Sequence, residues 1–157
     1  YFMRLNDYID SNYVIFLNGK QSKEQLLSQL AGELCALDNI KTPDIVLKAL
    51  LERESLGSTG IGGGIAIPHT RLSFIDDISI LIAISKEGID FSTVDKKMVN
   101  ILFLVLTPDK DMRKHLATLS HLSHIIKTTD FKKRVLESDD RQKVFEILKE
   151  EEDKLNG

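Results

Sequence analysis

A single histidine closes the most unusual stretch of the sequence, STGIGGGIAIPHTR at residues 58–71. Pro68 fixes its own φ angle and biases the preceding residue toward an extended form, so His69 should leave a strand end on a stiff backbone. A nucleophilic histidine needs such stiffness, because one ring nitrogen must point outward while a hydrogen bond holds the other. The pattern favours a histidine that accepts a phosphoryl group. The alternative is a histidine that only completes its hydrogen bonds at a strand terminus.

The glycines before this histidine allow the backbone to approach a ligand closely. Two familiar phosphate loops do not fit, because no Lys-Ser or Lys-Thr follows Gly64 and because Ile65 stands where a dinucleotide fingerprint has its third glycine. A tight turn remains, either purely structural or one that holds phosphoryl oxygens. The candidate phosphate-binding groups are the hydroxyls and N–H groups of Ser58, Thr59, Gly60, Gly62, Gly63 and Gly64.

Two more residues have the right chemistry and position to join His69. Arg53 follows Ala49 by one helical turn, on the inward face of its predicted helix, where a guanidinium could clamp a phosphate or pair with a nearby carboxylate. His115 lies in line with the apolar positions of a later helix, Leu119, Leu122 and Ile126. His115 should therefore point toward the sheet and away from solvent.

The other two histidines, His121 and His124, are predicted to form a surface pair, because they fall on or beside the polar face of the same helix. A zinc site is rejected, since His115 lies about 120° around the helix from this pair. No cysteine or carboxylate cluster completes a ligand set. We therefore expect no metal.

Composition limits the class of protein. The chain has 157 residues, 42% of them hydrophobic and 29% charged, which is ordinary for one folded domain. Its net charge of -3 argues against nonspecific nucleic-acid binding, and no apolar run is long enough to insert in a membrane. Cys35 is the only cysteine, so no internal disulfide forms, and its helical, apolar surroundings indicate a buried thiol. These features suit a cytoplasmic protein.

The predicted elements alternate between helix and strand, which indicates a layered α/β domain. Ser22 and Gln25 form a capping-box pattern at the first helix, and Thr42-Pro43 begins the second. Two nearly continuous apolar runs should be strands that are covered on both faces. The expected strands are 14–17, 65–67, 78–84 and 99–106, and the expected helices begin at 22, 43, 108, 131 and 140.

Several of these segments together resemble one family. The motifs are RESLGSTGIGGGIAIPHTR (53–71), GIDFSTVD (88–95), VNILFLVLTP (99–108) and HLATLSHL (115–122), with SKEQLLSQLAGEL (22–34) in register. They are similar to the fructose/mannitol-type IIA domains (EIIA type 2) of the bacterial phosphoenolpyruvate-dependent phosphotransferase system. The nitrogen-regulatory branch is most similar, since it has a basic residue two positions after the histidine, here Arg71. Thr70 and the Asp95-Lys96-Lys97 turn depart from the usual pattern.

The resemblance implies a fold and a set of roles. The fold would be a mixed β-sheet flanked by helices on both faces, in one domain over residues 3–157. His69 would accept the phosphoryl group, Arg53 would steady it, and His115 would be the second histidine of the active site. No metal or organic cofactor is implied.

The resemblance also implies partners. A histidine phosphocarrier protein would donate the phosphoryl group, and the phosphorylation state would then control a regulatory target such as a transporter or a sensor kinase. A sugar-specific IIA component that passes the group to a permease IIB domain is the first alternative. A IIA-like binding module without phosphotransfer is the second, and the intact set of His69, Arg53 and His115 argues against it.

Overall fold

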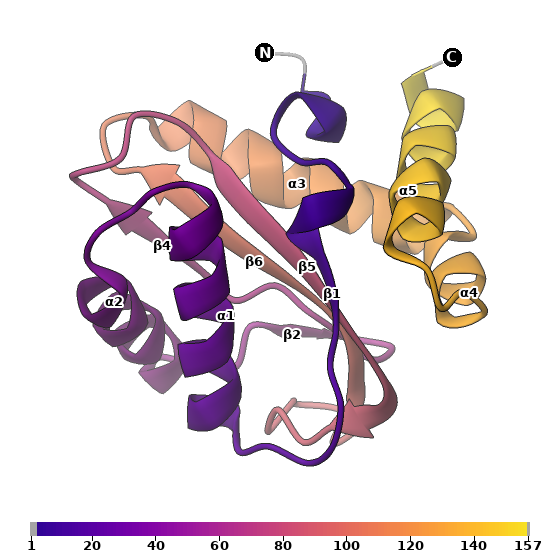
Figure 1. Ribbon diagram of the computed structural model, residues 1–157, viewed down its shortest axis with the longest axis horizontal. Helices are drawn as coiled ribbons and strands as arrows, with labels where there is room; N and C mark the ends of the chain where they lie inside the picture. Colours follow the sequence, from indigo (N-terminus) through magenta and orange to yellow (C-terminus); the bar gives the residue numbers. More distant parts are fainter. Residues whose placement is uncertain (1–2, 157) are drawn as a thin grey trace.

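The computed structural model describes residues 3–156, which form a six-stranded mixed sheet between two layers of helices (Figure 1). The sheet confirms the predicted α/β class with helices on both faces. Strand β1 pairs parallel to β5, β5 pairs antiparallel to β6, and β3 and β4 both run parallel to β6. The strands are β1 (Val14–Phe16), β2 (Gly60–Gly62), β3 (Ile65–Ala66), β4 (His69–Leu72), β5 (Ser79–Ile89) and β6 (Val99–Pro108).

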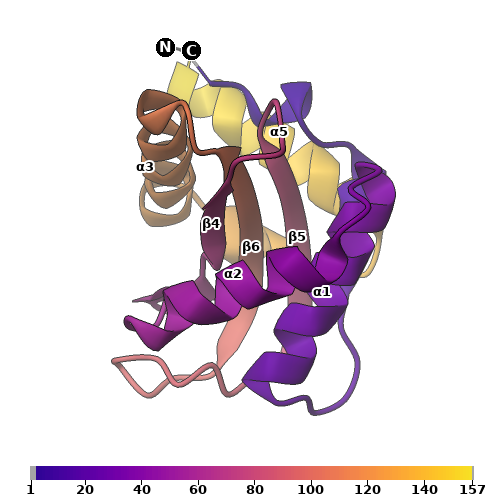
Figure 2. The same cartoon turned by 90° about the vertical axis from the view of Figure 1, so that its left-hand side faces the viewer.

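Five α-helices cover the two faces of the sheet (Figures 1 and 2). One face carries α1 (Lys23–Leu37) and α2 (Pro43–Ser55), and the other carries α3 (Met112–Thr128), α4 (Phe131–Leu136) and α5 (Arg141–Asn156). Two short 3-10 helices, η1 (Leu5–Asp7) and η2 (Ser11–Tyr13), precede β1. Within residues 3–156, no helix combines the length and the apolar character needed to span a bilayer.

Side chains alternate across β5 and β6, so each strand contributes to both cores. Ile82 and Phe103 pack under α3, α4 and α5, whereas Leu81 and Leu104 pack under α1 and α2. All four side chains are fully buried. The prediction that both apolar runs are covered on two faces is therefore confirmed.

Helix ends follow the predicted capping at the first helix but not at the third. The Ser22 hydroxyl accepts the Gln25 N–H at 3.1 Å, and the Gln25 side chain accepts the Ser22 N–H at 3.0 Å. The third helix begins at Met112 and not at 108, because Pro108 still belongs to β6. The Asp111 carboxylate, which accepts the Lys114 N–H at 3.0 Å, is the true N-cap.

Strands β3 and β4 lie end to end along the same side of β6. Ile65 is opposite Ile101, and His69 is opposite Val105 four residues further along. Pro68 separates the two strands, but its carbonyl still accepts the Val105 N–H at 2.9 Å, which keeps the chain on β6. His69 was expected to follow a strand end. It instead begins β4, which makes its backbone part of the sheet.

Candidate functional site

The parallel pairing of β4 with β6 fixes which face His69 occupies. His69 is opposite Val105, whose side chain is buried under α3, so the His69 side chain lies on that face. Arg71 is two residues further on and opposite Thr107, so it shares the same face. Helix α3 begins just beyond the end of β6 and brings its first turn, with His115, over this edge.

A cleft of about 950 Å³ is lined by residues of α2, of β4 and of the start of α3. Figure 2 shows the strand and these two helices next to one another. Its lining brings together all three predicted catalytic residues, Arg53, His69 and His115. Arg53 comes from the last turn of α2, and its guanidinium donates a 3.0 Å hydrogen bond to the Gly57 carbonyl. Among residues 3–156 it has no carboxylate partner, so the alternative of a salt bridge is not realised.

The His69 ring has a defined hydrogen-bond partner. Its Nδ1 lies 2.6 Å from the carbonyl oxygen of Ile67, which can only accept, so Nδ1 carries the ring proton and Nε2 keeps a free electron pair. Burial lowers the pKa of His69 below its ordinary value, and the charge of Arg53 lowers it further. The Ile67 carbonyl and Glu54 oppose this decrease without reversing it. The His69 ring is therefore neutral at neutral pH, with an unshared electron pair on Nε2.

A chain of hydrogen bonds ties the backbone N–H of Ile67 to helix α2. Glu54 accepts the N–H of Thr59 at 3.3 Å and also bonds to its hydroxyl. The carbonyl of Thr59 in turn accepts the Ile67 N–H at 3.0 Å. The Glu54 carboxylate is nearly buried and is balanced by Lys23, 2.6 Å away. Thr59 therefore supports the backbone that orients His69.

His115 is held by Thr107, at the end of β6. The Thr107 hydroxyl is 2.6 Å from Nδ1 of His115, and both residues are buried. This hydroxyl has no other hydrogen-bond partner among the described residues, so its proton goes to Nδ1. The ring proton of His115 therefore sits on Nε2, where it is a donor. The rings of His69 and His115 lie 5.5 Å apart.

Burial lowers the pKa of both histidines of the cleft, so both rings are uncharged at neutral pH. Burial lowers the pKa of His115 to about 4, and the nearby His69 and Arg71 contribute to the decrease. The positive charge of the cleft therefore comes from Arg53 and Arg71.

The structure does not bring the predicted glycine cradle to this cleft. Residues 60–66 form a hairpin beside the first half of β6, about 13 Å along the strand from the start of β4. The Gly63 N–H donates to Asp95 at 3.2 Å, and Lys132 donates to the Gly63 carbonyl. The Gly60 N–H donates to the Ser58 hydroxyl at 3.1 Å. None of the six predicted phosphate-binding residues lines the cleft.

The prediction of a surface pair at His121 and His124 is half wrong. His124 is exposed, but His121 Nε2 lies 2.6 Å from the carboxylate of Glu152, which is buried. Glu152 belongs to α5, and its other hydrogen bond is to the Leu5 N–H. His121 therefore fastens α3 to the end of the chain. Within the described part of the chain, no cluster of three potential metal ligands exists.

Three residues of the site were missed as candidates. Arg71 is two positions after His69, and the two-residue period of a strand would have placed both on one face. Glu54 follows Arg53, so its carboxylate could have been considered with it. Thr107 gave no local signal, because its role depends on the pairing of β6 with β4 and on the position of α3.

Comparison with known proteins places this cleft in context. Residues 7–151 match the family model described as "Phosphoenolpyruvate-dependent sugar phosphotransferase system, EIIA 2". The chain is 36% identical over 131 residues to a fructose-specific EIIA component from Haloferax volcanii, with 83% of each chain covered. It is 31% identical over 146 residues to a nitrogen regulatory protein from Bradyrhizobium diazoefficiens, covering 93% of this chain and 95% of the relative.

Solved structures have the same fold. The nitrogen regulatory protein IIA-Ntr from Neisseria meningitidis superposes with a TM-score of 0.83 at 25% identity, over 92% of this chain and 98% of the other. IIA mannitol from Escherichia coli superposes with a TM-score of 0.70 at 20% identity, over 88% and 96% of the two chains, which is a likeness of fold.

Proposed function

We propose that Nε2 of His69 receives and releases a phosphoryl group. The premise is that this chain belongs to the phosphoenolpyruvate-dependent sugar phosphotransferase system EIIA 2 family. Members of this family are phosphoryl-transfer components. The observation that carries the assignment to His69 is its 2.6 Å contact with the Ile67 carbonyl, which leaves Nε2 unprotonated at neutral pH. No separate base is then needed to activate the ring.

In the proposed step, the electron pair of Nε2 attacks phosphorus in line with the breaking bond to the donor. The donor is a phosphohistidine on a carrier protein, and the electron pair of its N–P bond returns to its own ring. The Nδ1 proton of His69 stays shared with the Ile67 carbonyl throughout. Because the transferred group is loosely bonded at the transition state, position and charge account for most of the catalysis.

Arg53 and His115 would stabilise the phosphoryl oxygens. Arg53 brings a permanent positive charge and its remaining N–H donors, since only one of them is bonded to Gly57. His115 brings the Nε2–H that Thr107 fixes. Arg71, on the same strand as His69, adds a second positive charge. A phosphoryl group would raise the pKa of His115 toward its usual value, so His115 would become cationic when the cleft is loaded.

The rim of the cleft suits a transient protein partner. Leu56, Met112 and Leu116 line it and are 82%, 44% and 58% exposed. Large apolar side chains left in water around a functional group are typical of interaction surfaces. A histidine phosphocarrier that docks here would bury them and bring its phosphohistidine to His69.

We further propose that phosphorylation serves regulation, with a transporter or sensor kinase among the possible targets. The coverage of 95% of a nitrogen regulatory relative and the overlap with IIA-Ntr support this role. A sugar-specific role is the second candidate, favoured by the 36% identity to a fructose-specific EIIA component. In that case the group would pass from His69 to a permease IIB domain. Labelled protein mixed with a IIB domain would lose label only in the second case.

Phosphoryl labelling tests the assignment of His69. Purified protein is incubated with labelled phosphoenolpyruvate, enzyme I and a histidine phosphocarrier. We expect acid-labile, base-stable label on the wild type and on His124→Ala, which removes an exposed histidine. We expect none on His69→Ala with an unchanged fold by circular dichroism. Label on His69→Ala at the wild-type rate would move the acceptor to another residue.

A further inference from the structure

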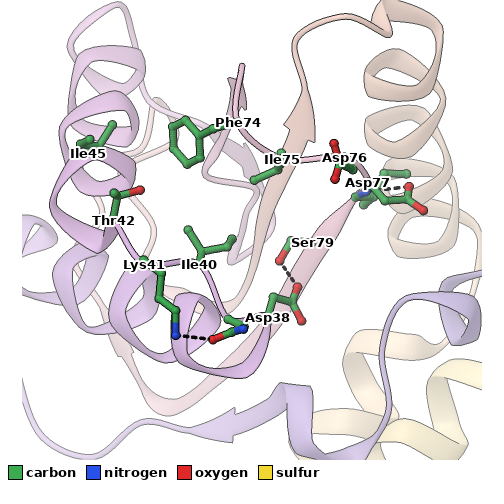
Figure 3. A pocket seen from close by; sticks show the side chains of 12 residues that line it. Asp38, Ile40, Lys41, Thr42, Ile45, Phe74, Ile75, Asp76, Asp77 and Ser79 are labelled. Atoms are coloured by element: carbon green, nitrogen blue, oxygen red, sulfur yellow. Dashed lines mark hydrogen bonds between the residues drawn. The ribbon is translucent and has the colours of Figure 1, made fainter.

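A second pocket, of about 670 Å³, lies between the turn that joins α1 to α2 and the loop that joins β4 to β5 (Figure 3). Residues 38–45 form one wall and residues 74–79 the other. Pockets of this volume are large enough to enclose a drug-sized group or a bulky side chain. None of the residues that line the His69 cleft takes part in this pocket.

The walls of this pocket leave large apolar side chains in contact with water. Ile45 is 53% exposed and Phe74 is 46% exposed. Figure 3 shows Ile45 on α2 across from Phe74, with Ile75 beyond Phe74 and Ile40 below them. An apolar concavity at the surface gains free energy when an apolar group fills it.

The floor of the pocket is held in place from below. Asp38 ends α1 and accepts a 2.5 Å hydrogen bond from the Tyr13 hydroxyl and a second bond from the Ser79 hydroxyl. The hydrogen bond to Asp38 and burial raise the pKa of Tyr13 to about 12. This network joins the turn after α1 to the start of β5. The pocket is therefore preformed, which reduces the entropy lost when a ligand binds.

The pocket lining carries more negative than positive charge, with Asp38, Asp76 and Asp77 against Lys41. Asp77 is paired with Lys114 at 2.8 Å, and Lys41 donates to the Asn39 side chain at 2.6 Å. Asp76 is exposed, and its carboxylate has no hydrogen bond or ion pair to any residue between 3 and 156. Figure 3 shows it beside Ile75 at the edge of the opening. A positively charged group next to an apolar one would complement this rim.

We propose that this pocket binds a protein segment that presents a bulky apolar side chain next to a lysine or arginine. The apolar side chain lies between Ile45 and Phe74, and the cation lies at Asp76. Of the polar side chains in the walls, Ser79 bonds to Asp38 and Lys41 bonds to Asn39, whereas the Asp76 carboxylate is left for a ligand. A side chain with a charged neighbour matches what the pocket offers. The negative rim disfavours phosphates and anionic lipid surfaces.

The pocket and the His69 cleft share no lining residue. On α2, Ile45 lines the pocket and Ala49 and Arg53 line the cleft, about 6 Å and about 12 Å from Ile45 along the helix axis. The two sites therefore lie next to each other along α2 but are built from different residues. The proposal does not depend on phosphoryl transfer at His69.

NMR titration of 15N-labelled protein tests the proposal with three blocked tripeptides, Lys-Trp-Lys, Glu-Trp-Glu and Lys-Ser-Lys. We expect Lys-Trp-Lys to shift the amide signals of residues 40–45 and 74–79, with saturation at millimolar concentration. Each of the other two peptides should bind at least about tenfold more weakly, because each lacks one of the two interactions. Shifts that map elsewhere, or equal binding of all three peptides, would overturn the proposal.

Two substitutions test whether Phe74 and Asp76 contact the peptide. Phe74→Ser and Asp76→Asn change exposed side chains, so both should fold, and each should weaken Lys-Trp-Lys by about fivefold to tenfold. Val94→Ala, which changes an 89% exposed apolar residue in a different loop, is the matched control and should bind as the wild type does. Unchanged affinity in either pocket variant would show that the peptide binds outside the pocket.

Discussion

One continuous stretch, residues 53–71, supplies Arg53, His69 and Arg71 to the cleft and also forms the glycine hairpin, but the cleft and the hairpin lie at different ends of β6. The cleft contains polar groups that can still bind a ligand, namely the unprotonated Nε2 of His69 and the remaining guanidinium donors of Arg53. At the tip of the hairpin both backbone polar groups of Gly63 are already bonded, the N–H to Asp95 and the carbonyl to Lys132. One sequence signature therefore contains both residues with polar groups left open in a cleft and residues whose polar groups are bonded within the fold.

The hairpin needs glycine for reasons of geometry. Gly63 and Gly64 have φ angles of +65° and +81°, a conformation that other residues adopt at a cost. A Cβ on Gly60 would lie 2.5 Å from the methyl group of Thr93. These glycines let two loops and a strand meet closely. The comparison predicts that the cleft controls transfer and that the hairpin controls stability.

The largest effect on transfer, after loss of His69 itself, is expected at Arg53. Replacement by alanine removes a charge and several donors from the transferred group, so the single-turnover rate from the carrier should fall by about 100-fold to 1000-fold. Arg53→Lys should recover part of the rate, because it keeps the charge but not the planar array of donors. Rapid-quench labelling measures both. Arg141→Ala, at the exposed start of α5, is the control. A rate for Arg53→Ala within about twofold of that control would show that Arg53 does not contribute to phosphoryl transfer.

Gly64→Ala is expected to change stability without changing transfer. The new Cβ would have a strained φ and would lie 3.0 Å from the Lys132 amine and 3.1 Å from the Asn100 side chain, so the free energy of unfolding should fall by about 1–3 kcal/mol. Gly32→Ala, in α1 with nothing near its Cβ, should instead gain about 0.5–1 kcal/mol. Urea unfolding gives both values. If Gly64→Ala folds but transfers the phosphoryl group slowly, the hairpin takes part in transfer and this prediction is wrong.

The cleft should also respond to pH through His115. Its pKa is about 4 in the folded protein and near 6.5 when unfolded, so the unfolded chain binds more protons between these values. Stability conferred by the neutral ring is complete above about pH 6.5 and declines as the pH falls toward 4. From about pH 7 to about pH 5, the wild type should lose about 2 kcal/mol more than His115→Gln.

Chemical denaturation at the two pH values measures this difference. The contribution of His69, whose pKa is also lowered, is present in both proteins and cancels. Equal losses in the wild type and in His115→Gln would mean that His115 is not held neutral. His124→Gln, at an exposed position on the same helix, should behave as the wild type does.

The sequence predicted those features that depend on local chemistry. The capping box at Ser22, the burial of Cys35 and the position of His115 on the inner face of its helix follow from residue types and spacing alone. The helix that was expected at 108 begins at 112, because Pro108 completes a strand whose length depends on its pairing with Leu72. A proline suits either place, so the local pattern could not decide.

Features that depend on contacts distant in sequence could not be predicted. His121 is on the flank of its helix, but its partner Glu152 comes from α5, 31 residues later. The glycines indicated that the backbone is approached closely, but not by which group. The structure shows that the approaching group is the loop that contains Thr93 and Asp95. The supporting role of Thr59 likewise required knowledge of where Glu54 and Ile67 lie.

The smallest of the expected effects on the transfer rate is at Thr107. We infer that Thr107 positions His115 without touching the phosphoryl group. Thr107→Val keeps the shape but removes the donor to Nδ1, so the His115 ring should populate both neutral tautomers and transfer should slow by about tenfold. Thr107→Ser should restore the wild-type tautomer and rate. Long-range 1H–15N NMR of the ring nitrogens reads the tautomer directly. If the valine variant keeps the Nε2–H form, another group sets the tautomer of His115. If transfer is slow and the tautomers are mixed, Thr107 is a positioning residue: from the buried strand β6 it controls which nitrogen of His115 faces the phosphoryl group.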